Sequence, residues 1–331
     1  MLLAAPPAVR AELGLVESEA NEDASEAPSD WVEQWAVPEG FSISIDTEGY
    51  HYPTAIAFVP NPGQDPKDPL YFVTELRGTV KVVTNDRTVH TFAEHFLQSE
   101  FHDERPRGNA EFGLAGICLA PRQGYVFITF TYQDDNKVLR NNVIRFKTAP
   151  RKFSVKPESR RAFTDVFAAY ESGLSHQIGP CKVDDGMLYV SVGDGYKYLG
   201  SQQLDTLRGK IIRMTLDGKP APANPFYEDD DINKGRNYVW AYGLRNPFSL
   251  EIVDDHVMVA ENGVGIDRFL EIEQGRTTCG MAGTTASPRT RPTCFWTASA
   301  PCRWIICRQR HRYSRSATQI NFMWPRRAAP A

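Results

Sequence analysis

Hydrophobic residues along this chain occur in short runs, rich in β-branched and aromatic side chains and separated by Gly, Pro, Asn and Asp. Scarcely any stretch has the spacing of an amphipathic helix, whereas short runs bounded by turn residues are typical of β-strands. No apolar run reaches the roughly 18 residues needed to cross a bilayer. The pattern therefore predicts an all-β protein with no membrane span.

The same succession of strands recurs along the chain. An apolar strand, a turn, a second strand centred on aromatic or aliphatic residues and usually a third strand opened by Gly or Asn repeat at intervals of about 60–70 residues. The repeats start near Ala55, Leu114, Cys181 and Leu250. Radial repetition of small antiparallel sheets forms a β-propeller, so we predict about four blades. A β-sandwich is the alternative, because one sequence does not prove radial closure.

The composition changes abruptly after Arg276. Residues 277–331 contain no acidic residue, no lysine and nine arginines, which leaves 28 basic and 41 acidic residues, a net charge of −13, in residues 1–276. A tail drawn from the composition of the rest of the chain would hold about eight acidic residues. The chain is therefore divided into an acidic segment, 1–30, that is disordered or the remnant of an export signal, a folded part, 31–276, and an Arg/Thr/Pro-rich tail, 277–331, expected to be disordered or irregular.

Seven motifs follow one another within the folded part. In order they are YPTAIAFVP, YFVTELRGTVKVV, AEFGLAGICLAP, SHQIGPCKVDDGMLYVSVGDG, LRGKIIRMTLDGKPAPANPF, VWAYGLRNPFSLEI and AENGVGID. Together they resemble the soluble quinoprotein glucose/sorbosone and aldose sugar dehydrogenases, over about residues 37–276. The resemblance implies a six-bladed β-propeller that uses pyrroloquinoline quinone (PQQ) and calcium and is periplasmic or secreted. Since only about four units are found here, whether this chain is itself an active enzyme is left open.

His176 is the strongest candidate for a catalytic group. It comes just before a Gly-containing turn into a predicted strand, which favours a loop end, where binding residues concentrate. A lone histidine is more often structural, but imidazole is well suited to take a hydroxyl proton near neutral pH. The resemblance implies that His176 is the catalytic base, that Gln177 lies beside it in the cofactor pocket and that Asp194 orients the base. The reaction so implied is removal of the C1 hydroxyl proton of an aldose, with hydride transfer to PQQ and onward to an electron acceptor.

Arg245 and Asn246 in YGLRNP, and Glu111 in NAEFGLAG, are candidate cofactor-binding residues. In the family the Arg-Asn pair contacts the quinone, and a guanidinium beside a carbonyl that gains negative charge is favourable electrostatics. Arg245 is thereby also a candidate for catalysis. A salt-bridged or turn residue is the alternative for the pair. Glu111 matches a position at the edge of the family's pocket, although an exposed loop residue fits the sequence nearly as well.

The motif ENGVG is the candidate metal site. The resemblance implies that the backbone carbonyls of Gly263 and Val264 hold calcium, with Asn262 among the residues that bind the quinone. Oxygen-only ligation suits calcium, which would act as a Lewis acid. The alternative is a hairpin turn, because Asn-Gly is a favoured turn sequence.

The remaining motifs give no competing function. Cys118 and Cys181, the cysteines of the folded part, could be two buried thiols. VGDGYKYLG has the wrong glycine spacing for a nucleotide loop, and DDDINKG lacks the closing Glu of a calcium loop, so we interpret it as a solvated acidic turn. CRWIICRQRH matches no zinc spacing. The tail's arginines lack a nucleic-acid motif and the folded part is acidic, so no nucleic-acid partner is predicted.

The tail has the character of an out-of-frame translation. The family pattern has Asn-Tyr-Gly-Trp-like sequence after EIEQGR, where this chain has Thr277, Thr278 and Cys279. One base inserted ahead of these codons permits Asn-Tyr, three variable residues and then Gly-Trp. The hypothesis is a frameshift, with a natural isoform as the alternative. A function of another class, a non-catalytic propeller that binds a protein or glycan, also stays open.

Overall fold

The computed structural model describes residues 43–95, 111–263, 266–278 and 294–297, together with Pro38 and Gly40. Val264, and the candidate zinc ligands and arginines of the tail, lie outside the described residues. The chain separates into two compact units, one spanning Thr47–His311 and the other made of Met1–Asp46 and Arg312–Ala331. All the described sheets belong to the first unit.

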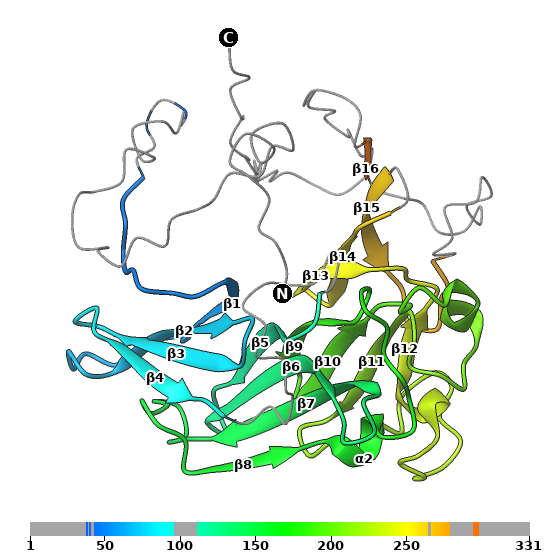
Figure 1. Ribbon diagram of the computed structural model, residues 1–331, viewed down its shortest axis with the longest axis horizontal. Helices are drawn as coiled ribbons and strands as arrows, with labels where there is room; N and C mark the ends of the chain where they lie inside the picture. The colour runs from blue at the N-terminus through cyan, green and yellow to red at the C-terminus, as the bar shows by residue number, and fades with distance from the viewer. Residues whose placement is uncertain are drawn as a thin grey trace, which may run out of the picture. The chain divides into compact units, whose positions relative to one another are not determined.

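The described strands form four sheets of four strands, and within each sheet neighbouring strands pair antiparallel in chain order (Figure 1). The first sheet contains β1 (Pro53–Phe58), β2 (Pro69–Glu75), β3 (Thr79–Thr84) and β4 (Val89–Ala93). The second contains β5 (Leu114–Ala120), β6 (Tyr125–Gln133), β7 (Leu139–Lys147) and β8 (Ser159–Ala162). The third sheet contains β9 (Ile178–Asp184), β10 (Met187–Val192), β11 (Lys210–Thr215) and β12 (Val239–Tyr242). The fourth contains β13 (Pro247–Val253), β14 (His256–Glu261), β15 (Ile266–Ile272) and β16 (Cys294–Thr297).

The four sheets confirm the predicted repeat. Ala55, Leu114, Cys181 and Leu250 all lie in the first strand of a sheet, β1, β5, β9 and β13. These first strands are neighbours in space, β1 beside β5, β5 beside β9 and β9 beside β13. Each sheet therefore extends outward from an inner strand, as the blades of a propeller do, and the sandwich alternative is wrong. We number the sheets blade 1 to blade 4.

Three hydrophobic clusters fill the spaces between successive blades. Strand β6 shows the principle, because Val126 and Ile128 face blade 1 while Phe127 faces blade 3. A strand buried on both faces needs a continuous apolar run, which is why YVFITFTY shows no alternation. The third cluster joins Tyr189 and Trp240 of blade 3 to blade 4. Each fully buried large side chain contributes about 1.5–3 kcal/mol.

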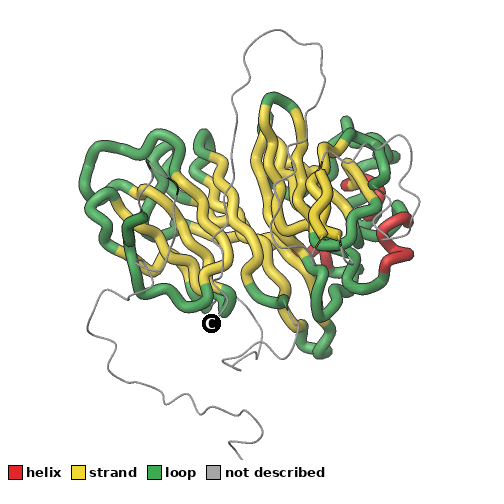
Figure 2. The backbone as a smooth tube through the Cα atoms, turned by 90° about the horizontal axis from the view of Figure 1, so that it is seen from above, coloured by secondary structure: helices red, strands yellow, loops and turns green. Residues whose placement is uncertain are grey.

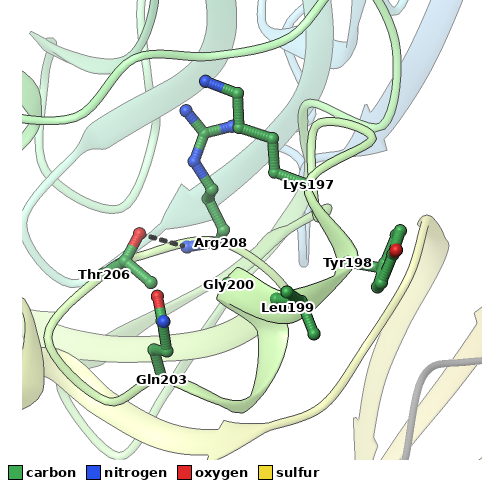
Figure 3. Close-up of a pocket in the computed structure, with 7 residues that line it drawn as sticks. All are labelled: Lys197, Tyr198, Leu199, Gly200, Gln203, Thr206 and Arg208. Carbon is green, nitrogen blue, oxygen red and sulfur yellow. Dashed lines mark hydrogen bonds between the residues drawn. The ribbon is translucent and has the colours of Figure 1, made fainter.

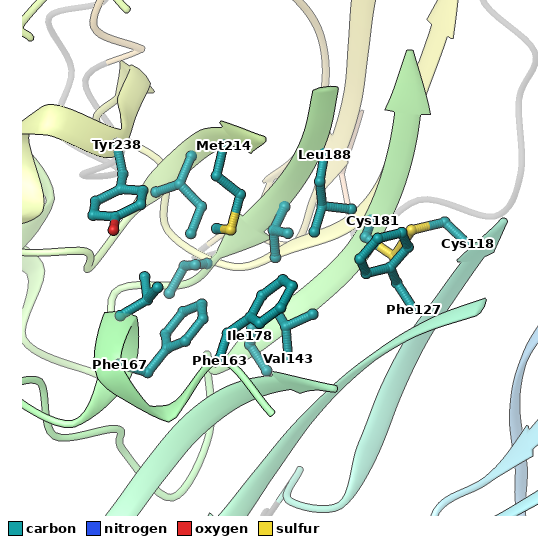
Figure 4. Close-up of a cluster of buried hydrophobic side chains, with 14 of the residues drawn as sticks. Cys118, Phe127, Val143, Phe163, Phe167, Ile178, Cys181, Leu188, Met214 and Tyr238 are labelled. Carbon is teal, nitrogen blue, oxygen red and sulfur yellow. A yellow bond between two sulfur atoms is a disulfide. The ribbon is translucent and has the colours of Figure 1, made fainter. Parts of the chain in front are cut away.

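A disulfide crosses the middle cluster, which corrects the interpretation of two buried thiols. Cys118 in β5 and Cys181 in β9 are bonded, with their Cα atoms 5.6 Å apart (Figure 4). The two cysteines are 63 residues apart in sequence and belong to different sheets. Only the packing of one inner strand on the next brings them together, so no local sequence pattern could reveal the bond.

Helix is confined to short segments among the described residues (Figure 2). These are α2 (Thr164–Phe167) and the 3₁₀ turns η1 (Tyr198–Gln202) and η2 (Gly235–Tyr238). Within the part of the chain that the structure describes, no helix is long and apolar enough to cross a membrane.

The first residues of the tail continue the folded part. Thr277 forms a parallel bridge with Tyr242, and Thr278 donates its amide to the Tyr242 carbonyl at 2.9 Å. Further along, β16 pairs antiparallel with β15 and completes blade 4. A strand in this segment was not part of the expectation for the tail; it arises where the sequence CFWT supplies four consecutive residues compatible with a strand.

Candidate active site

The loops at one end of the blades bring the candidate residues together. His176 and Gln177 precede the inner strand β9, and the hairpin after β10 returns to the same end because the two strands are antiparallel. The amides of Gly193 and Gly195 donate to the carbonyls of Gln177 and His176, at 2.7 and 2.9 Å. The segment before blade 4 joins them, since the Asp194 amide donates to the Arg245 carbonyl at 2.7 Å.

The centre of this cluster is a buried pair of side chains. His176 Nδ1 lies 2.7 Å from Asp194 Oδ1, and both residues are buried. A carboxylate at Nδ1 fixes the ring tautomer, with the proton on Nδ1 and the lone pair on Nε2. Asp194 is itself held by the Tyr196 amide, which donates to Oδ1 at 2.9 Å. Such an oriented imidazole can accept a proton from a substrate hydroxyl.

The backbone of His176 is fixed as firmly as its ring. Its φ of 56° is in the left-handed region, which is unfavourable for a residue other than glycine. The amide donates to Glu111 Oε2 at 2.9 Å, and the carbonyl accepts from Gly195. A Cβ on Gly193 would lie 2.4 Å from the His176 carbonyl oxygen, so only glycine fits there. Glycine at 193 therefore allows the hairpin to approach the base.

Arg245 is oriented by groups of blade 4. Its backbone amide donates to Glu261 Oε2 at 2.8 Å, and its Nη1 donates to the Asn262 carbonyl at 2.8 Å and to Asn262 Oδ1 at 3.0 Å. Glu261 is buried and also forms an ion pair with Arg268. Among the described residues the guanidinium is hydrogen-bonded through Nη1 alone. Nη2 and Nε are therefore available to an anionic or carbonyl group of a ligand.

Glu111 links three blades. Its Oε2 accepts the His176 amide and lies 3.5 Å from Asn246 Nδ2, so one carboxylate contacts the loops that enter blades 3 and 4. The Glu111 amide in turn donates to the Leu174 carbonyl at 3.0 Å. The sequence left an exposed loop residue as an alternative; Glu111 does lie in a loop and is exposed, and its carboxylate also contacts the His176 amide.

Gln177 presents an acceptor without a partner. Its Nε2 donates to the Gly173 carbonyl at 2.6 Å, while Oε1 is buried and has no hydrogen bond within the described part of the chain. A buried acceptor left unpaired is unfavourable by about 1–3 kcal/mol. A ligand that brings a donor to this position would relieve that cost.

The candidate metal loop follows β14. The Asn262 amide donates to the Asn246 carbonyl at 2.9 Å, and Asp267 Oδ1 accepts from Asn262 Nδ2 and from the Gly263 amide, at 3.2 and 3.1 Å. No hydrogen bond to the Gly263 carbonyl occurs among the described residues. They contain no group of three His, Cys, Asp or Glu side chains that could hold a metal. That result does not bear on ligation by backbone carbonyls, which is the chemistry predicted for Gly263 and Val264.

The sequence did not single out Tyr196. Its ring centroid lies 4.0 Å from that of His176, and the residue is 54% exposed. It therefore covers the imidazole on one side and presents its other side to solvent. Its position two residues after Asp194 in a glycine-rich hairpin was the available signal.

Beyond Tyr196 the same hairpin forms a pocket of about 400 Å³ (Figure 3). It is lined by Lys197, Tyr198, Leu199, Gly200, Gln203, Thr206 and Arg208. Burial lowers the pKa of Arg208 below its usual value, with Glu171 and Asp194 opposing the shift. The neighbouring Lys210 is fully buried, and burial lowers the pKa of its ammonium group to about 7.

The acidic DDDINKG segment lies away from this cluster. Asp229, Asp230 and Asp231 are exposed, and Lys234 forms ion pairs with Asp229 and Glu228. Hydrogen bonds with Lys234 and Asn237 lower the pKa of Asp229 to about 2. The contacts are those of a solvated turn.

Comparisons with known proteins agree with the motifs. The family model described as Glucose / Sorbosone dehydrogenase matches residues 50–277. Over 62 residues the chain is 36% identical to aldose sugar dehydrogenase YliI of Escherichia coli (strain K12), a match that covers 19% of this chain and 16% of that protein. The matched segment ends one residue after Arg276, where the resemblance in sequence ends.

Solved structures share the fold. The PQQ-bound aldose sugar dehydrogenase of Streptomyces coelicolor is 25% identical, with a TM-score of 0.59 over 77% of this chain and 71% of that chain. The apo soluble aldose sugar dehydrogenase of Escherichia coli is 17% identical, with a TM-score of 0.58 over 77% of this chain and 74% of that chain. The second likeness bears on the fold alone.

Proposed function

Because the chain belongs to the glucose/sorbosone dehydrogenase family, we propose that the site around His176 oxidises the C1 hydroxyl of an aldose, with PQQ and calcium as cofactors. The observation that carries the proposal is the buried His176–Asp194 pair, 2.7 Å apart. The Asp194 amide is bonded to the Arg245 carbonyl, and the Arg245 guanidinium uses Nη1 alone among the described residues. A quinoprotein sugar dehydrogenase needs a base for the hydroxyl proton and donors for its cofactor, and these residues offer both.

His176 accepts the proton of the sugar hydroxyl at Nε2. Asp194 holds the tautomer in which this nitrogen carries the lone pair and stabilises the imidazolium that forms. The hydrogen bonds of Glu111 and Gly195 to the His176 backbone keep the ring in place while it changes charge. The Tyr196 ring shields one face of the imidazole from water.

The remaining side chains fit the cofactor. Arg245 Nη2 and Nε, together with Asn246 Nδ2, supply donors to the carbonyl and carboxylate oxygens of PQQ, and the unpaired Gln177 Oε1 supplies an acceptor. When bound, PQQ supplies the acceptor for the hydrogen and the two electrons that leave C1. Asn262 positions Arg245 and so acts on the cofactor through it.

Gly263 offers one of the two carbonyls proposed to hold calcium; Val264 lies outside the described residues. The Gly263 carbonyl has no competing hydrogen bond among the described residues, and the Asp267 carboxylate accepts from the Gly263 amide. Carbonyl and carboxylate oxygens are the ligands that calcium prefers. When bound there, calcium supplies a Lewis acid.

The disulfide supports an exported protein. Disulfides form and persist in the periplasm or outside the cell, whereas cytosolic thiols are kept reduced. The Cys118–Cys181 bond therefore favours the periplasmic or secreted location that the family resemblance implies.

Reconstitution tests the proposed function. The purified protein, as it stands and with its reading frame repaired as described below, is mixed with PQQ and calcium, and reduction of an artificial electron acceptor is followed with several aldoses. The variants are compared in the form that is active. His176→Ala should abolish the oxidation, and Asp194→Asn should lower kcat by about 10²–10⁴-fold because the amide favours the wrong tautomer. Asp185→Asn, in the exposed turn between β9 and β10, is the matched control and should leave the rate unchanged.

If the 331-residue chain shows no oxidation, a frame-repaired protein distinguishes a truncated, inactive dehydrogenase from a protein with another function. We propose that residues 277–331 are translated out of frame, so a gene repaired by one base ahead of codon 277 should encode further propeller-like sequence. An unbroken frame shared by related transcripts would contradict the frameshift. If the repaired protein binds no PQQ, the dehydrogenase proposal fails and a non-catalytic binding propeller takes its place.

A further inference from the structure

We propose that the pocket beside Tyr196 is a subsite for the anionic group of a sugar substrate, a carboxylate or a phosphate carried away from the reacting hydroxyl. The inference rests on the proposed function, which it deepens by naming the substrate class. The pocket is lined by two cations, Lys197 and Arg208, by the amide of Gln203 and by the hydroxyl of Thr206, and by no acidic side chain. Its volume of about 400 Å³ is within the range of small-molecule sites.

Arg208 has unused hydrogen-bonding capacity. Its Nη1 is buried and has no hydrogen-bond partner in the described part of the chain. Its backbone amide donates to Thr206 Oγ1 at 3.3 Å, which holds these two lining residues together (Figure 3). A buried donor left without a partner is unfavourable, and a bidentate anion is the group that the guanidinium's fork of donors matches.

Lys197 adds a second charge on the same side of the loop (Figure 3). Its Nζ lies 3.7 Å from Glu171 Oε2, which is beyond hydrogen-bond distance, and both side chains are more than half exposed. Such a pair is weak and leaves Lys197 able to turn to another anion. Glu171 is also the larger of the two negative charges that oppose the lowering of the Arg208 pKa, and Asp194 is the other.

Lys210 makes the wall of the pocket rigid. Its buried ammonium donates to the carbonyls of Gly200 at 3.0 Å and Ser201 at 2.9 Å, and also to that of Arg208. The three carbonyls belong to the loop that lines the pocket. Below pH 7, where its ammonium is protonated, Lys210 also adds to the positive potential behind Arg208.

The pocket lies next to the candidate base. A Cβ on Gly195 would be 2.6 Å from Arg208 Nη1, so the guanidinium packs against the residue that follows Asp194. Tyr196 directly precedes Lys197 in the sequence. Its ring lies against the His176 imidazole and is partly exposed to solvent. A sugar whose hydroxyl reaches His176 can therefore lie over Tyr196 and direct a distant anionic group at Arg208 and Lys197.

Binding by the whole 331-residue protein without PQQ tests the subsite. Calorimetric titrations with glucuronate, glucose 6-phosphate, glucose and inorganic phosphate give four dissociation constants. The two anionic sugars should bind about tenfold or more tightly than glucose, because a charge-assisted hydrogen bond is worth that much. The advantage should shrink as salt is raised. Comparing the dissociation constants of glucuronate and glucose 6-phosphate shows whether the pocket prefers a carboxylate or a phosphate.

Variants assign the effect to the pocket. Arg208→Gln combined with Lys197→Gln should reduce the preference for anionic sugars to about one and leave glucose binding unchanged. Lys219→Gln, an exposed lysine after β11, is the matched control and should keep the preference. Lys197→Gln alone changes an exposed side chain, so it keeps the test valid if the double variant unfolds; it should lose about threefold of the preference.

Three results would overturn the subsite. Glucose could bind as tightly as the two anionic sugars, or the preference for anionic sugars could persist in the double variant. Inorganic phosphate alone could also bind as tightly as the anionic sugars. The test is independent of oxidation. Activity on neutral aldoses without anion preference removes only the subsite. Anion preference without activity on any sugar after reconstitution of the frame-repaired protein removes only the proposed function.

Discussion

The backbone of His176 is positioned by two neighbouring residues, Gly193 and Glu111. Gly193 allows the hairpin to lie against the His176 carbonyl, and Glu111 holds the amide on the other side. The base therefore depends on groups that do not take part in proton transfer. This arrangement makes the backbone of His176 more sensitive to its neighbours than its burial alone would indicate.

Gly193→Ala should displace His176. The added methyl group would overlap the carbonyl oxygen at 2.4 Å, and overpacking of this kind lowers stability by about 1–3 kcal/mol. Nuclear magnetic resonance of the imidazole should show a shifted His176 signal. Gly186→Ala is the control: a Cβ there meets nothing, although its φ of 71° adds backbone strain. An unchanged His176 signal in Gly193→Ala would contradict this account of the hairpin.

Lys210 gives the protein a pH dependence of stability. Burial lowers the pKa of its ammonium from the usual 10.5 of an exposed lysine to about 7 in the folded protein. Between these two pH values Lys210 is protonated in the unfolded chain and neutral in the folded chain. The free energy of unfolding therefore rises with pH, by at most about 1.4 kcal/mol per pH unit. Below pH 7 both states are protonated and the full penalty of burial applies.

Urea denaturation at pH 7, 8 and 9 measures this effect. The free energy of unfolding of the unsubstituted protein should rise over this range, and Lys210→Met should remove most of the rise. Lys219→Met changes an exposed lysine and should keep it. A slope that is the same in all three proteins would mean that another group titrates.

The strands and the disulfide form the next level of organisation. Cys118 and Cys181 join the inner strands of blades 2 and 3, and the bond closes a loop of 63 residues. In the chain-entropy account such a loop gives about 4 kcal/mol of stabilisation. The bond therefore stabilises the packing of β5 on β9, the pair of inner strands nearest the candidate base.

Removing the bond should lower the melting temperature by about 10 °C. Calorimetry with and without dithiothreitol measures the change. The double variant Cys118→Ser, Cys181→Ser should melt at the lower temperature in both conditions, which separates loss of the bond from other effects of the reductant. An identical melting temperature for the oxidised and reduced protein would show that the bond adds no stability.

The sequence predicted the blades because they depend on local patterns. Apolar runs such as MLYVSV and KIIRMT, bounded by turns, mark β10 and β11 without knowledge of their partners. Contacts between blades have no local signature, so the Cys118–Cys181 bond was missed. In the site, His176 and Asp194 were paired through the family resemblance. Tyr196 packs on His176, and Arg208 packs against Gly195, by the path of one hairpin, which neither periodicity nor motif spacing encodes.

The assembly of four blades leaves two apolar faces exposed. On β1, Ile56 and Phe58 are 51% and 64% exposed and alternate with alanines that pack toward blade 2. On blade 4, Val253 and Phe269 are exposed and alternate with residues that pack toward blade 3. Apolar faces of this kind are typical of surfaces that pack on further blades. We propose that the six-bladed ring of the family is open in this chain.

An open ring should bind PQQ weakly or not at all. The cofactor's carboxylates need charge partners on several sides, and Arg245 with Asn246 supplies them on one. Titration with PQQ in millimolar calcium, followed by cofactor absorbance and melting temperature, should show no saturation at micromolar concentration. Saturable micromolar binding with a clear rise in melting temperature would contradict this prediction and show that the site is complete as it stands.

Three of the four hydrophobic clusters lie between successive blades, and this division has a consequence for cooperativity. Each blade is stabilised only by its neighbours, so the molecule resembles a short linear array in which opening proceeds from the ends. Blades 1 and 4 have one stabilising interface each, while blades 2 and 3 have two and share the covalent link. Native-state hydrogen exchange should therefore show amides of β2 and β14 exchanging through partial opening, and amides of β6 and β10 exchanging only when the whole array unfolds.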